Sequence, residues 1–193
     1  MLENLSLKKT VLTVATLNLI YFAYEFSIAR QINSVSLFAD SVDFLEDASV
    51  NILIFLAFGW SIKTRVKLGY LFSGLLLIPG IAVLSVAWEK FQNPVTPESL
   101  TLGLTGFGAL IVNGFCAYLL VRFKKSKESL TKAAYLSARN DAFANMAIIF
   151  ASVISLFWAS GWPDLIVGIV ILLLNLDSAK EVLEASRRER ALT

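Results

Sequence analysis

Residues Ser34–Asn51 read SVSLFADSVDFLEDASVN and continue into the apolar run ILIFLAF, and this stretch decides the fold. Four acids fall within eight of its residues: Asp40, Asp43, Glu46 and Asp47. At about 100° per residue on a helix, three of these acids and Asn51 share a stripe about 80° wide, and Glu46 lies on its flank. The pattern predicts one apolar helix with an acidic face.

The rest of the chain is apolar enough to surround that helix with membrane-spanning partners. Hydrophobic residues make up 56% of its 193 residues and charged residues 17%, against about 25% charged in soluble domains. A bilayer-crossing helix needs about 20 mostly apolar residues. We therefore predict an all-α membrane protein with one six-helix transmembrane domain over residues 1–193 and no C-terminal cytoplasmic domain. The expected helices span about 11–29, 37–58, 68–88, 100–121, 133–158 and 163–182.

The basic residues are distributed unevenly between the two ends of the predicted helices. Fourteen lie in the N-terminal segment, in alternate connections and after the sixth span: Lys8, Lys9, Lys63, Arg65, Lys67, Arg122, Lys124, Lys125, Lys127, Lys132, Lys180, Arg187, Arg188 and Arg190. Two, Arg30 and Lys90, fall in the other connections. Lys and Arg concentrate on the cytoplasmic side, so both termini are expected in the cytoplasm.

The composition also excludes several kinds of chemistry. The chain has no histidine and one cysteine, Cys116, so His-based catalysis, His metal ligands and Cys-rich zinc modules are ruled out. Its net charge of +2 is too small to indicate a nucleic-acid partner. Any site must use carboxylates, amides, hydroxyls and backbone groups.

The fifth span repeats the polar spacing of the second. Ser137, Asp141 and Asn145 follow one another at four-residue intervals, as Asp43, Asp47 and Asn51 do. Two helices with the same polar ladder can face each other and enclose an ion. The three aspartates repel one another unless a proton or a cation lies between them, and each costs about 2.5–3.5 kcal/mol inside a membrane. We therefore predict a cation or proton site.

Several polar residues allow a second interpretation. Ser137 serves equally well as a helix–helix hydrogen bond, and Asn51 and Asn145 fit a supporting role better than direct ligation. Asp40 is either an outer ligand or a helix-start residue. Glu25 is expected near the outer end of its helix, where water solvates it. Asp164, which follows Pro163, is expected to interact with the first turn of its own helix.

The chain resembles the cation diffusion facilitator family of divalent metal/proton antiporters, of the kind that lacks a cytoplasmic C-terminal domain. The resemblance is carried by the stretch at residues 34–51, by the Asp141-xxx-Asn145 spacing, by NPVTP at residues 93–97 and by WPD at residues 162–164. Ser137 departs from the pattern, because the family usually has His or Asp at that position.

The resemblance implies efflux of a divalent metal by metal/proton antiport, with a zinc-type ion as substrate and manganese, iron, cobalt and cadmium as further candidates. The implied site lies between the second and fifth helices at Asp43, Asp47, Asp141, Ser137 and Asn145. The metal is a transported substrate, and no cofactor or enzymatic activity is implied. A bacterial inner membrane and a homodimer are also expected, the dimer through transmembrane helices such as the third with Gly69, Ser73 and Gly74.

Three other functions are alternatives to divalent metal efflux. The same acids suit a monovalent cation transporter or a proton-coupled small-solute transporter, which metal-binding calorimetry would distinguish. An intramembrane aspartyl protease is disfavoured, because the Tyr-Asp and Gly-x-Gly-Asp signatures are missing. A sensor or scaffold with a vestigial site is disfavoured by the retained aspartates.

Overall fold

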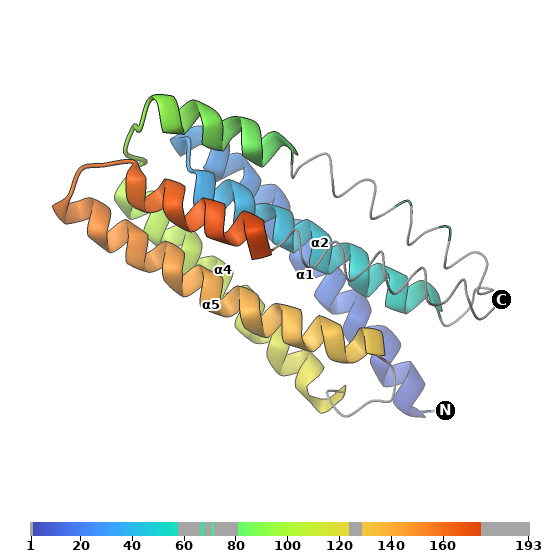
Figure 1. Ribbon diagram of the computed structural model, residues 1–193. Helices are drawn as coiled ribbons and strands as arrows, with labels where there is room; N and C mark the ends of the chain where they lie inside the picture. Colours follow the sequence, from blue (N-terminus) through green and yellow to red (C-terminus); the bar gives the residue numbers. More distant parts are fainter. Residues whose placement is uncertain (1, 58–66, 68–70, 72–80, 124–128, 175–193) are drawn as a thin grey trace.

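The computed structural model describes residues 2–57, 67, 71, 81–123 and 129–174. Every regular element in these ranges is helical, which confirms the predicted all-α class (Figure 1). In chain order they are α1 (Leu2–Ile32), α2 (Val35–Ala57), a helix at 81–92, α4 (Ser99–Leu120), the short 3-10 helix η1 (Val121–Phe123), α5 (Ser129–Phe157) and a helix at Trp162–Leu174.

Two helices, α1 and α5, begin well before the apolar runs that predicted them. The first was expected over 11–29 and covers Leu2–Ile32, and the fifth was expected from residue 133 and begins at Ser129. Polar turns can continue a helix past the hydrocarbon core, so hydropathy measures the span rather than the whole helix. The 68–80 part of the third span and the end of the sixth, after residue 174, lie outside the described residues.

The described helices fit an integral membrane protein. Three are long and apolar enough to cross a bilayer, at Leu7–Ile32, Ser99–Leu120 and Ser137–Phe157. α2 has comparable length, and its four acids lower its hydropathy. The outer surface of α4 exposes large apolar side chains such as Leu104, Ile111 and Phe115. A soluble monomer rarely exposes such a continuous apolar surface, whereas lipid requires one.

The helices pack in pairs, α1 against α2 and α4 against α5, and the pairs meet where α2 contacts α5 and α1 contacts α4 (Figure 1). The α1–α2 turn, the 93–98 connection and the 158–161 connection lie at one end of the bundle. The start of α1 and η1 lie at the other end. The helices therefore run alternately up and down the bundle. Because α2 and α5 are in contact, the acidic stretch of α2 lies beside the polar residues of α5.

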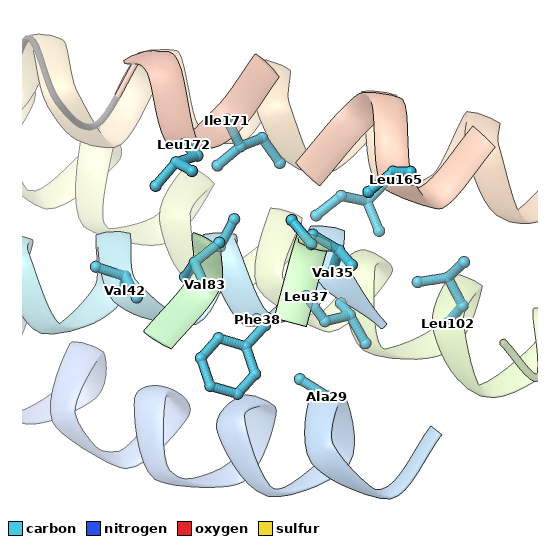
Figure 2. Close-up of a cluster of buried hydrophobic side chains, with 13 residues drawn as sticks. Ala29, Val35, Leu37, Phe38, Val42, Val83, Leu102, Leu165, Ile171 and Leu172 are labelled. Atoms are coloured by element: carbon cyan, nitrogen blue, oxygen red, sulfur yellow. The ribbon is translucent and has the colours of Figure 1, made fainter. Parts of the chain in front are cut away.

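Two hydrophobic clusters form the core, one towards each end of the bundle. The first joins α1, α2, α4, α5 and the helices at 81–92 and Trp162–Leu174; its members include Ala29, Phe38, Val83, Leu102, Ile148 and Leu165 (Figure 2). The second joins α1, α2, α4 and α5; it contains Val11, Val14, Ile54, Cys116, Leu120 and Ala138. Along α2, most of the buried acids lie between Val42 and Ile54, so the clusters bracket a polar layer.

A buried ion pair fixes the start of α2. Asp164, which is fully buried, accepts hydrogen bonds from the hydroxyls of Ser34 and Ser36 at 2.6 Å each and from the backbone N–H groups of Val35 at 2.9 Å and Ser36 at 3.2 Å. The Lys90 ammonium lies 2.8 Å from the same carboxylate and donates to the Asn33 carbonyl at 2.6 Å. We call this set the Asp164 junction. It ties together α2 and the helices at 81–92 and Trp162–Leu174.

The junction revises two expectations. Asp164 was expected to interact with the first turn of its own helix, and it instead binds the first N–H groups of α2, where the partial positive charge of that helix end attracts an anion. Lys90 was counted as a connection charge and is fully buried against Asp164. The turn that brings them together passes through Asn33, whose positive φ of 52° is tolerated better by Asn than by most residues.

Candidate cation-binding site

α2 directs its acids into the protein. Asp40 is fully buried, Asp43 is 8% exposed and Asp47 is 3% exposed. Glu46 is also buried and has an interaction partner. The shared stripe inferred from the spacing thus becomes one buried face, where water is too scarce to screen carboxylates from one another.

α5 brings the complementary groups to this face. The Ser137 hydroxyl lies within hydrogen-bonding reach of both Asp47 and Asp141. Asp141 also interacts electrostatically with Asp43. Four of the five residues expected at the site, Asp43, Asp47, Ser137 and Asp141, therefore lie within electrostatic or hydrogen-bonding range of at least one other member. Among the described residues, no three acidic or cysteine side chains are grouped closely enough to enclose a metal ion.

Asn145, the fifth expected residue, uses both ends of its amide in other contacts. Its Oδ1 accepts a hydrogen bond from Asn113 Nδ2 of α4 at 3.1 Å. Its Nδ2 donates to Asp40 Oδ2 at 2.6 Å. Asn145 thereby links α4, α5 and α2 one helical turn from Asp141. Asn51 uses only one end of its amide: its Nδ2 donates to the Asp47 carbonyl at 2.8 Å, whereas its Oδ1 is buried without a hydrogen-bond partner.

Glu25 is the residue whose place differs most from the sequence expectation. It was expected near a solvated helix end, and it is fully buried and faces Asp40. Neither Glu25 oxygen has a hydrogen-bond partner, and Asp40 Oδ1 has none either. The available signal was that Glu25 and Asn18 share one face of α1; Asn18 is also fully buried. We call Glu25, Asp40, Asp43, Asp47 and Asp141 the acid layer.

The acid layer can bind cations and exchange protons, and its side-chain donors are all oxygens. Hard cations prefer oxygen ligands, and zinc also accepts carboxylates. Cys116 Sγ lies 3.9 Å from Asn18 Oδ1 and packs in the second hydrophobic cluster. A thiol at that place contributes to packing.

Comparisons with known proteins identify a family for this chain. The family model described as "Cation efflux transmembrane domain" matches residues 11–189. The chain is 25% identical over 172 residues to a protein of Bacillus subtilis (strain 168) named "Cadmium, cobalt and zinc/H(+)-K(+) antiporter". It is 25% identical over 169 residues to a protein of the same name in Bacillus velezensis. Each alignment covers 80% of this chain and 54% or 53% of the relative, so the chain spans about half the length of these relatives.

Proposed function

The chain belongs to the cation efflux family, and from this premise we propose that it moves divalent metal ions out of the cytoplasm in exchange for protons. The ion would bind between α2 and α5, in the part of the acid layer formed by Asp43, Asp47 and Asp141. The family consists of transporters, so the metal is a substrate carried across the membrane and no catalytic step is assigned to the acids.

The observation that carries the proposal is the position of Ser137. Its hydroxyl lies between Asp47 of α2 and Asp141 of α5, and Asp141 faces Asp43. Two buried carboxylates of α2, Asp43 and Asp47, and the partly buried Asp141 of α5 concentrate negative charge that a divalent cation neutralises. The Ser137 hydroxyl, within reach of Asp47 and Asp141, offers a neutral oxygen ligand. This geometry supports the ligand set inferred from the two matching ladders.

Each residue then has a distinct role. Asp43, Asp47 and Asp141 bind the ion through carboxylate oxygens, and Ser137 completes the set with its hydroxyl. Asn145 holds Asp40 and Asn113 in place beside the ion, because its amide is already bonded to both. When the metal leaves, repulsion among the carboxylates favours proton uptake, and metal binding releases those protons again.

We propose a broad divalent selectivity, with zinc carried and harder ions such as manganese tolerated. Zinc usually prefers at least one nitrogen or sulfur ligand, which this site lacks, although it binds most sites more tightly than manganese does. The printed names of the two relatives, with cadmium, cobalt and zinc, support this range.

The export direction requires an orientation. The distribution of basic residues supports cytoplasmic termini in a bacterial inner membrane. A cysteine introduced at Ser126 should react with an impermeant reagent from the cytoplasmic side only, while the buried Cys116 stays unlabelled. Labelling of position 126 from the outer side would reverse the direction. We also propose a homodimer; the face expected at Gly69, Ser73 and Gly74 lies outside the described residues.

The function is tested by metal uptake into proteoliposomes that contain a pH-sensitive dye. We expect zinc, cobalt and cadmium to cross the membrane and protons to move in the opposite direction. Liposomes without protein provide the background. Movement of sodium or potassium with no divalent flux would overturn the proposal in favour of a monovalent cation transporter.

A further inference from the structure

Glu25 lies beside the proposed metal site and has no role in it. It is two helical turns along α1 from Asn18, and its carboxyl group is fully buried and faces Asp40. α1 is fixed at this level, since the Tyr21 hydroxyl donates to the Thr105 carbonyl of α4 at 2.6 Å and the Tyr21 ring lies 4.8 Å from that of Phe44. Glu25 is therefore held against α2.

The buried carboxyl groups of Glu25 and Asp40 lack a hydrogen-bond donor. Asp40 Oδ2 accepts from Asn145, which stabilises Asp40 as a carboxylate. Asp40 Oδ1 and both Glu25 oxygens have no donor, although the two carboxyl groups are within hydrogen-bonding reach of each other. Two ionised carboxylates can only accept. A proton on Glu25 supplies the missing donor, because its O–H can point to Asp40 Oδ1.

Among the described residues, the groups that interact electrostatically with Glu25 include no cation. Asp40 of α2 and Tyr21 of α1 are the titratable groups that face Glu25. α4 carries no charged residue along Ser99–Leu120. From α5, Asp141 interacts electrostatically with Asp40 and adds further negative charge. A buried carboxylate without a cation is strongly disfavoured, so the neutral acid is the form that this environment accepts.

We propose that Glu25 is an exchange site for a proton, held as a neutral acid that donates to Asp40 in the metal-free protein and released when the divalent ion binds. The inference rests on the proposed antiport and assigns one of its protons to a residue outside the ligand set. Asp40 connects the two sites, because it interacts with both Asp43 and Asp141.

Electrostatics determines the direction in which metal binding changes the protonation of Glu25. A divalent ion among Asp43, Asp47 and Asp141 brings two positive charges close to Asp40 and Glu25, which favours the ionised form of Glu25. Its O–H bond then breaks, and the proton passes to water on the side from which the metal entered. Reciprocally, a proton returning to Glu25 weakens metal binding. Both steps conserve the proton and need no other reactant.

Infrared difference spectroscopy tests the proton directly. In metal-free protein we expect the carbonyl band of a protonated carboxylic acid, and zinc should weaken it. Glu25→Gln should remove a component of that band. Gln imitates the neutral acid and can donate to Asp40 Oδ1, so this variant should fold. Wild-type protein with no such band, or a Glu25→Gln spectrum equal to that of wild type, would overturn the inference.

Proteoliposomes measure the consequence. Glu25→Gln should bind zinc about tenfold more weakly than wild type by calorimetry near neutral pH, because its neutral side chain cannot lose the proton that metal binding releases. It should still carry zinc down a gradient. The protons exchanged per metal ion should fall by about one. Glu89→Gln, at an exposed glutamate, is the matched control and should match wild type. A wild-type proton count in Glu25→Gln refutes the role of Glu25 alone, whereas normal zinc binding by Asp47→Asn and Asp141→Asn would refute the metal site.

Discussion

The Asp164 junction and the acid layer both bury carboxylates inside one helix bundle, and they satisfy them in opposite ways. Asp164 receives four hydrogen bonds from the start of α2 and an ion pair from Lys90. In the acid layer the carboxylates face one another, and three oxygens of Glu25 and Asp40 have no donor. A buried charge that is fully paired holds a structure together, whereas buried charges that lack partners need an ion or a proton that can come and go.

The largest effect should come from removing a charged ligand from the acid layer. Asp47→Asn and Asp141→Asn should each reduce zinc transport in proteoliposomes to the background of empty liposomes. Their thermal midpoint in detergent should equal or exceed that of wild type, because each variant relieves repulsion among neighbouring acids. Normal transport by both variants would exclude the site between α2 and α5.

An Asp→Asn substitution in the Asp164 junction should lower the stability of the fold. Asp164→Asn leaves the fully buried Lys90 ammonium without its counter-charge, and such a loss costs about 3–5 kcal/mol. We expect a clear fall in the midpoint of denaturation in mixed micelles. Lys90→Met should cost less, because Asp164 keeps its donors from Ser34, Val35 and Ser36. If Asp164→Asn is as stable as Asp47→Asn, the contrast between the two regions fails.

A smaller change tests how closely the junction is packed. A Cβ added at Gly168 would lie 2.8 Å from the Ser36 backbone nitrogen and 2.8 Å from the Val35 carbonyl carbon. The backbone of α2 must shift to admit it, so Gly168→Ala should destabilise by about 1–3 kcal/mol. Gly114→Ala on α4 meets nothing within 4 Å and should stabilise by about 0.5–1 kcal/mol. Equal stabilities of the two variants would contradict the close contact.

The sequence predicted the acid layer better than it predicted the junction, for a physical reason. Asp43 and Asp47, like Ser137 and Asp141, are spaced within single helices, where the 100° period places them on one face without tertiary information. Lys90 and Asp164 are 74 residues apart and meet only after three helices have packed. From the sequence alone, a lysine in a short connection cannot be distinguished from a solvent-exposed charge. Glu25 was misplaced because hydropathy gives the extent of a span and not the depth or neighbours of one residue within it.

The subtlest change concerns which ion the acid layer prefers. Ser137 is a neutral oxygen donor between Asp47 and Asp141, so Ser137→His places an imidazole where both helices present carboxylates. Zinc gains more from a nitrogen ligand than manganese does, and the ratio of zinc to manganese affinity by calorimetry should rise on the order of tenfold. Ser137→Ala removes the hydroxyl and adds no ligand, and as the control it should weaken both ions while changing their ratio little. If the zinc affinity of the His variant falls relative to its manganese affinity, position 137 does not face the ion. The ligand set would then consist of Asp43, Asp47 and Asp141 alone.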